Sequence, residues 1–137
     1  MTCGLVGCDA GLLDSGVIGL AGLGPGLTPA GDDFLLGFVA GLFLERLDRA
    51  RGWSASSVGQ RIAMLATQRT TRLSGQWLRC AGSGQFGAPW HGLADGARTG
   101  DRALLASALA RIVATGDTSG RAALSGCIAA TTALSAG

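Results

Sequence analysis

The chain has 137 residues with 24 glycines; 47% of the residues are hydrophobic, 15% are charged, and the formal net charge is +2. A chain of this length suits one domain and can bury a core without disulfides. Because the net charge is small and the arginines are scattered, nothing argues for a nucleic-acid partner. The apolar run over residues 34–44 is about half as long as a membrane span, so we expect a buried helix there and no membrane partner.

The cysteines and the lone histidine give no metal-site pattern. They are Cys3, Cys8, Cys80, Cys127 and His91, and the cysteines lack the paired spacing of a zinc site. We interpret them as free thiols in a reducing cytosol. The N-terminus shows no basic region followed by an apolar core, which argues against a signal peptide. The expected location is therefore cytoplasmic.

We predict an all-α fold, a compact bundle of four to five helices around a buried apolar helix that contains glycines. Residues 1–15 are glycine-rich and weakly patterned, so we expect a weakly ordered lead-in there. A single helical domain should then span residues 16–137. Residues 16–21 could form a short strand or an extended segment before the first long helix.

The most informative stretch is residues 22–37, GLGPGLTPAGDDFLLG. Its glycines can adopt backbone angles barred to other residues and leave room for a ligand near the main chain. Thr28 followed by Pro29 predicts a helix start, because threonine can cap free N–H groups and proline is favoured at the first helical position. We expect this helix to run from about residue 29 to residue 51.

The front half of this helix is apolar on every side, which indicates burial all round. Gly37 and Gly41 lie one turn apart on one face, where a neighbouring helix can approach closely. The last helix is rich in alanine and also presents small residues. We therefore expect the first and last long helices to pack closely against each other.

The glycine-rich loop is a candidate ligand site. Free N–H groups around Gly24, Gly26 and Gly31, with Thr28 beside them, suit a phosphate or carboxylate at the helix N-terminus. The spacing is not that of a phosphate-binding P-loop, because no Lys-Ser or Lys-Thr follows the glycines.

Asp32 and Asp33 leave two interpretations open. They would repel an anion unless a cation intervened, and could instead hold Mg²⁺, which binds through one or two carboxylates plus waters and substrate oxygens. A capped helix with acids in its first turn is also ordinary structure, because the helix dipole favours negative charge there.

A second helix is expected over residues 55–81, with Ser54 or Ser56 as its cap. Its apolar stripe would consist of Val58, Ile62, Leu65, Ala66, Leu73 and Trp77. Arg69 falls near the middle of this stripe and Thr70 flanks it, so Arg69 would need Asp32, Asp33 or a bound anion as its partner. The alternative is that Arg69 extends to the surface or makes a purely structural ion pair.

Three further helices are expected, over about 90–98, over about 101–114, and from the loop at 115–120 to about residue 135. That polar loop carries Asp117, Thr118, Ser119 and Gly120. These residues could simply cap the last helix, or two polar helix N-termini and Arg69 could meet at one pocket.

The stretch GLGPGLTPAGDDFLLG closely resembles the signature of a bacterial family catalogued as domain of unknown function 2877, which includes the AllH subunit associated with oxamate carbamoyltransferase in anaerobic allantoin breakdown. RTTRLSGQWLRCAGSGQF at 69–86 and TGDTSGRAALSG at 115–126 also fit the pattern. The last segment departs from it, with Asp117 where the family suggests histidine and Ala122 where it suggests aspartate. Relatives are longer, so the chain resembles their C-terminal portion.

This resemblance implies a small-anion-binding subunit or fragment of a carbamoyltransferase-like enzyme in nitrogen or purine catabolism, with a ligand of the carbamoyl phosphate or oxamate type. The glycine-rich loop would orient the ligand, Asp32 and Asp33 would hold Mg²⁺ or an amide or ammonium group, and Arg69 would clamp a carboxylate or phosphate. Carbamoyl transfer needs positioning and charge stabilisation, which these residue types supply. Other subunits or an N-terminal domain are the implied partners.

The alternative function is a non-catalytic structural or assembly module of a multi-subunit complex. It predicts that Asp32, Asp33 and Arg69 form a closed internal ion-pair network without a ligand-sized cavity. The ligand-binding hypothesis predicts an open cleft beside them.

Overall fold

The computed structural model describes residues 1–7, 9–45 and 53–136, which form eight helices and contain no strand. The helices are α1 (Thr2–Val6), α2 (Ala10–Leu20), α3 (Ala30–Leu44), α4 (Ala55–Thr67), α5 (Arg72–Gly82), α6 (Ala88–Thr99), α7 (Arg102–Val113) and α8 (Ser119–Ser135). The all-α prediction is confirmed, but the described helices outnumber the four or five expected.

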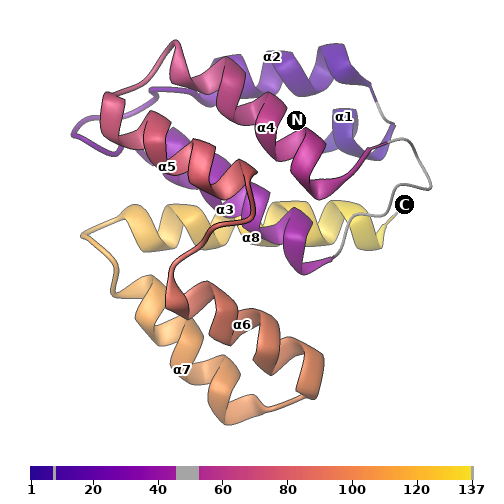
Figure 1. Ribbon diagram of the computed structural model, residues 1–137, viewed down its shortest axis with the longest axis vertical. Helices are drawn as coiled ribbons and strands as arrows, with labels where there is room; N and C mark the ends of the chain where they lie inside the picture. The colour runs from indigo at the N-terminus through magenta and orange to yellow at the C-terminus, as the bar shows by residue number, and fades with distance from the viewer. Residues whose placement is uncertain (8, 46–52, 137) are drawn as a thin grey trace.

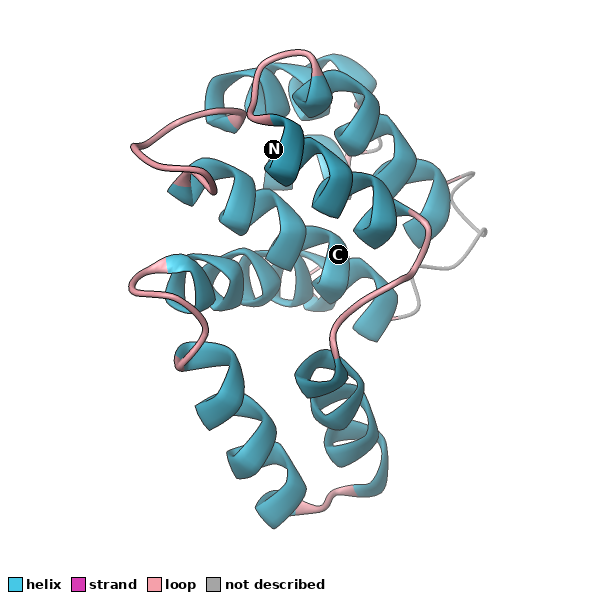
Figure 2. Cartoon of the chain, turned by 60° about the vertical axis from the view of Figure 1, so that its left-hand side comes forward, coloured by secondary structure: helices cyan, strands magenta, loops and turns pink. Residues whose placement is uncertain are grey.

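Helix α3 is the centre of the molecule. It is buried on nearly every side along its length, as its apolar sequence predicts. Figure 1 shows α3 and α8 side by side, with α1, α2, α4 and α5 on one side of the pair and the α6–α7 hairpin on the other. Figure 2 shows the hairpin projecting away from the remaining helices.

Glycines set the close approach of α3 and α8. A Cβ atom on Gly37 would lie 1.7 Å from the carbonyl oxygen of Ala123, and one on Gly126 would lie 2.0 Å from that of Phe34. At Gly41 a Cβ atom would meet the Cys127 carbonyl oxygen at 2.8 Å. The two backbones therefore touch, and the predicted close packing of the first and last long helices is confirmed.

The N-terminal helices belong to the main core. Asp9 caps α2 by accepting hydrogen bonds from the Gly11 and Leu12 N–H groups at 2.9 and 3.1 Å. Residues 1–15, expected as a lead-in, contain α1 and half of α2, and Leu5 and Leu13 are buried in the same core as α3. Residues 16–21 were wrongly predicted as a strand or extended segment; the Asp9 cap and the burial of one apolar face favour the helix instead.

The prediction of one helix over residues 55–81 is wrong, because this segment forms two helices, α4 and α5. Ser54 caps α4 in a capping box with Ser57, and Thr71 caps α5 by accepting from the Ser74 N–H at 3.1 Å. The turn between them ends the predicted stripe after Ala66, so Leu73 and Trp77 are 40% and 44% exposed.

The α6–α7 hairpin has a smaller apolar cluster of its own. Leu93, Ala108 and Ile112 are buried there, and the side chains packed against them are Trp90 and Leu105 of the hairpin, Leu44 of α3 and Leu124 of α8. The helices predicted from residues 90, 101 and 120 are confirmed with shifts at their ends, whereas α3 ends at Leu44 and residues 46–51 lie outside the described part of the chain. Among the described helices, none is both long and apolar enough to cross a membrane.

The contact between α3 and α8 gives a stability prediction. Replacing Gly37 with alanine should lower the free energy of unfolding by about 3 kcal/mol, because the added methyl group collides with backbone rather than with a movable side chain. The measurement is urea unfolding followed by circular dichroism. Gly19→Ala is the matched control: it lies in helix α2 with no atom within 4 Å of the new Cβ, so it should raise stability by about 0.5–1 kcal/mol. Equal effects of the two substitutions would contradict the packing argument.

Candidate functional site

Asp32 joins three parts of the chain. It is 2% exposed; its Oδ1 atom accepts the Gly22 N–H at 2.9 Å, and its Oδ2 atom accepts the Thr70 hydroxyl. These bonds fasten the start of the glycine-rich loop and the α4–α5 turn to the first turn of α3. Asp32 therefore acts as an internal cross-link in this structure.

The glycines of the loop have different surroundings. Gly22 has a φ of 74°, and a Cβ atom there would lie 2.3 Å from the Arg69 carbonyl oxygen, so both backbone angle and space require glycine. Gly24 and Gly26 also have positive φ angles and lie on the exposed part of the loop. Gly31 differs, because its N–H donates to the Leu23 carbonyl at 2.9 Å and is already satisfied.

The other end of the loop connects two helix N-termini. The Thr71 hydroxyl donates to the Leu27 carbonyl oxygen at 2.6 Å, and the Thr28 and Ser119 hydroxyl oxygens are 3.2 Å apart in a hydrogen bond. Thr28 was wrongly expected to cap α3, whose N-cap is Pro29 without a side-chain cap. Thr28 instead ties the start of α3 to the start of α8, so these two polar N-termini do meet.

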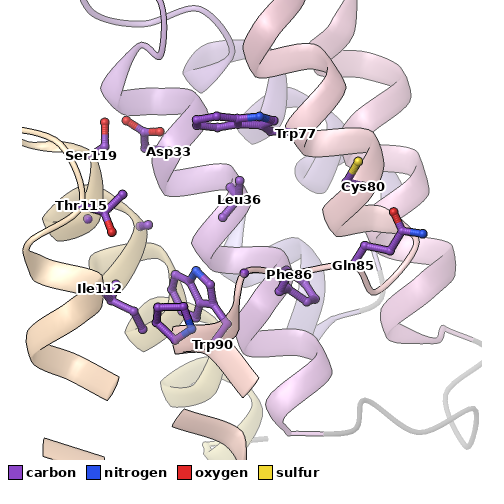
Figure 3. A pocket seen from close by; sticks show the side chains of 14 residues that line it. Asp33, Leu36, Trp77, Cys80, Gln85, Phe86, Trp90, Ile112, Thr115 and Ser119 are labelled. Atoms are coloured by element: carbon purple, nitrogen blue, oxygen red, sulfur yellow. The ribbon is translucent and has the colours of Figure 1, made fainter. Parts of the chain in front are cut away.

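A cavity of about 370 Å³ lies beside this junction, between the α3–α8 pair, α5 and the base of the hairpin. It is lined by Asp33, Leu36, Trp77, Cys80, Gln85, Phe86, Gly87, Pro89, Trp90, Ile112, Thr115, Ser119, Gly120 and Ala123. Figure 3 shows Asp33 and Ser119 facing each other at one end, with Trp77 beside them and Trp90 on the other side of Leu36. One end is thus polar and the walls are apolar and aromatic.

Asp33 is the most unusual group in the cavity. The residue is 6% exposed, and its Oδ2 atom is buried without a hydrogen-bond partner among the described residues. Burial raises the pKa of Asp33; the nearby Ser119 hydroxyl opposes this shift and the Asp32 carboxylate adds to it. An unpaired buried carboxyl oxygen is costly, and a ligand that donates an N–H or O–H to it would remove that cost.

The N-terminus of α8 faces the same end of the cavity. Its N-cap residue, Thr118, makes no side-chain cap hydrogen bond, and its first turn carries no acidic residue. Ser119 and Gly120 line the cavity, while Asp117 and Thr118 are exposed and do not. The positive end of the α8 dipole therefore points at a site where negative charge is favoured.

Arg69 lies apart from this site. It is exposed in the α4–α5 turn, and its Nη1 atom donates to the Leu65 carbonyl oxygen at 3.3 Å. Among the described residues it forms no ion pair with Asp32 or Asp33. It was expected within a buried stripe because residues 55–81 were read as one helix; the turn at 68–71 moves its side chain outward.

The sequence analysis did not predict the aromatic walls of the cavity. Trp77 was assigned to a buried stripe and Trp90 only to the start of a helix, although tryptophan is scarce in the chain. Nothing in the sequence brings residues 77, 86 and 90 to Asp33 without the fold. The one hint in the sequence was that Trp77 lies within the family-like motif at 69–86, which could have made it a candidate site residue.

Metal-ligand groups and thiols add little to the site. Within the described residues, no three His, Cys, Asp or Glu side chains are grouped so as to hold a metal ion. Cys3, Cys80 and Cys127 are free thiols, and burial raises the pKa of Cys127 to about 11, with Glu45 adding to the shift. Cys8 lies outside the described residues.

Comparison with known proteins gives one family. A family model described as oxamate carbamoyltransferase subunit AllH matches residues 20–131, which include the glycine-rich loop and every residue that lines the cavity. Searches of the curated proteins and of the solved structures each found no match.

The Asp32 cross-link can be tested through its partner. Thr70→Val should lower the free energy of unfolding by about 1–3 kcal/mol, because it leaves a buried carboxylate oxygen without a donor. Thermal and urea unfolding measure the effect. Thr132→Val, at an exposed position of α8, should change stability by less than about 0.5 kcal/mol. A Thr70→Val protein as stable as the control would show that the cross-link is dispensable.

Asp33 gives a pH-dependent prediction. Because its pKa is higher in the folded chain than in the unfolded one, the folded state binds the proton more tightly; this contribution is complete below about pH 4 and is lost as the pH rises through the folded pKa. Asp33→Asn removes the charge, so at pH 7 the variant should be more stable than the parent by on the order of 1 kcal/mol. Urea unfolding at several pH values should show this advantage shrinking toward pH 3. If Asp33→Asn were less stable than the parent at pH 7, the Asp33 carboxylate would have to be stabilised by the chain, against the interpretation of an unpaired buried oxygen.

Proposed function

We propose, because the chain belongs to the family of the oxamate carbamoyltransferase subunit AllH, that it is a ligand-binding subunit of such an enzyme and that its site is the cavity beside Asp33. Its expected partners are the other subunits of that enzyme. The observation that carries the proposal is the unpaired Oδ2 atom of Asp33, opposite the N-terminus of α8.

The two polar features suit the two ends of oxamate. Its amide N–H can donate to the Asp33 carboxylate, and its carboxylate can lie at the N-terminus of α8 beside Ser119, while the Gly120 N–H stays bonded to the Thr115 carbonyl oxygen at 3.0 Å. Carbamoyl phosphate offers the same pair of groups, an amide N–H and an anionic end. The Asp33 carboxylate would repel a simple anion, but a ligand with both an amide N–H and an anionic end can place its N–H donor there instead.

With oxamate on Asp33 and the N-terminus of α8, carbamoyl transfer requires carbamoyl phosphate to lie beside the bound oxamate rather than in its place. The amide nitrogen of oxamate attacks the carbonyl carbon of carbamoyl phosphate, a C–N bond forms, the C–O bond to phosphate breaks, and the nitrogen loses a proton. Asp33 is placed to accept that proton, because its unpaired oxygen would receive the amide N–H and its pKa is raised. The rest of the contribution is positioning of the two substrates in the cavity.

Asp32 has a supporting role in this proposal. Both of its oxygens accept hydrogen bonds from the chain, so it positions the loop and α3 rather than contacting the ligand. A Mg²⁺ ion would find one available carboxylate, that of Asp33, which fits a shared metal site poorly. The proposal therefore assigns no step to a metal ion.

An assembly role is a second candidate, and the exposed apolar side chains of the loop favour it. Leu23 and Leu27 are 59% and 72% exposed, as expected of a surface that another subunit covers. This candidate predicted a closed Asp32, Asp33 and Arg69 network without a cavity. Asp32 is indeed satisfied internally, but the cavity at Asp33 favours ligand binding.

Calorimetric titration tests the proposal. The folded chain, alone and with the other subunits, is titrated with oxamate and with carbamoyl phosphate, each with and without Mg²⁺. Saturable binding of oxamate is expected, weakened at least about tenfold in Asp33→Asn because the charged acceptor is lost.

Arg69→Ala serves as the matched control and also tests the predicted clamp. From its exposed position we expect unchanged affinity. Oxamate binding that survives in Asp33→Asn but is lost in Arg69→Ala would move the site to the α4–α5 turn. Absence of binding by the folded chain under both conditions would reject the ligand-binding role.

A further inference from the structure

The cavity is larger than the proposed small ligand needs. Oxamate has only two carbon atoms, whereas a volume of about 370 Å³ lies in the range of about 300–1,000 Å³ that takes drug-sized ligands. Asp33 and Ser119 occupy one end, and the remaining length is left to groups that a two-carbon acid cannot reach. Oxamate and carbamoyl phosphate are both polar, whereas this remaining space is bordered mostly by apolar and aromatic side chains, so its lining suits an occupant with apolar surface.

The walls of this remaining space are mostly aromatic. Trp77, Phe86 and Trp90 line it together with Leu36, and the side chains of Cys80, Gln85 and Thr115 also border the cavity. Phe86 is fixed from behind by an edge-to-face contact with Phe43, with ring centroids 5.6 Å apart. The Trp77 side chain, in contrast, is 44% exposed. A flat ring placed against Trp77 would cover apolar surface that now faces water.

The Asp33 carboxylate indicates which polar group such a ligand should carry. Among the described residues that line it, Asp33 is the one charged side chain, and no arginine lies with it. The unpaired Oδ2 atom calls for a donor. An amide or amidine attached to the ring would donate N–H groups to this oxygen, whereas an ionised carboxylate has no hydrogen to donate.

We propose that the cavity binds a ligand in which a planar ring carries an amide or amidine group, with the N–H donors on Asp33 and the ring between Trp77 and Trp90. This inference rests on the proposed function for the location of the site, and it deepens that function by naming a ligand class larger than oxamate. Such a ligand fills the apolar length of the cavity and satisfies its one unpaired oxygen.

Three probes of nearly equal shape test the inference: benzamidine, benzamide and benzoate. They place a cationic, a neutral and an anionic group on the same ring. Titrated calorimetrically against the folded chain at pH 7.5, benzamidine should bind at least about tenfold more tightly than benzoate, with benzamide between them. Asp33→Asn should remove the preference for benzamidine over benzamide.

The ring contact has its own variant and control. Trp77→Ala should weaken benzamidine and benzamide by about five- to tenfold, since it removes one wall of the ring site. Leu73→Ala, one turn earlier on α5 and 40% exposed but outside the cavity lining, should leave both affinities unchanged. Circular dichroism establishes that each variant is folded.

The outcomes separate this inference from the proposed function. No saturable binding of benzamidine or benzamide, tightest binding of benzoate, or equal effects of Trp77→Ala and Leu73→Ala would each overturn it. Benzamide binding without oxamate binding would support the ring site and reject the oxamate site. Oxamate binding without benzamide binding would support the oxamate site and reject the ring site.

Discussion

The structure depends on one buried carboxylate. Asp32 holds the Gly22 N–H and the Thr70 hydroxyl, so one side chain determines where the glycine-rich loop leaves α2 and where α4 gives way to α5. Because an unpaired oxygen on a buried carboxylate is costly, the Asp32 hydrogen bonds couple the formation of these three segments. The neighbouring Asp33 is then left as the acid with an oxygen to spare. Of two adjacent aspartates, Asp32 is thus satisfied by the chain, and Asp33 is the one that we propose for ligand binding.

Close helix packing brings the site together. The glycines that let α3 and α8 touch also bring the first turns of both helices to one end of the molecule, where Thr28 and Ser119 bond. Asp33, one turn into α3, then faces the start of α8. Larger residues at Gly37 or Gly126 would separate these N-termini and open the polar end to water. The small-residue face is therefore a requirement of the site as well as of the core.

The sequence predicted the elements better than their junctions. Period and caps identified the long apolar helix, and small residues identified its contact with α8. Arg69 was misplaced because periodicity alone cannot detect a turn produced by Thr71 capping a new helix and by a distant aspartate binding Thr70. The glycine loop and Asp33 were recognisable from local pattern. The aromatic walls were not, since Trp77 and Trp90 meet only through tertiary packing.

The apolar cluster at the α6–α7 hairpin is smaller than the main core, so the hairpin is held less strongly than the other helices. Its joints at Gly84 and Gly116 both have positive φ angles, and its cluster around Leu93 and Ile112 is smaller than the main core and meets α3 and α8 at Leu44 and Leu124. Sub-global opening, in which the hairpin parts from α3 and α8, therefore costs less free energy than complete unfolding. Since Trp90 and Ile112 belong to the hairpin, that motion exposes the cavity while the Asp32 cross-link stays intact. A partial opening of the fold would thus give the proposed ligand a route into the cavity without complete unfolding.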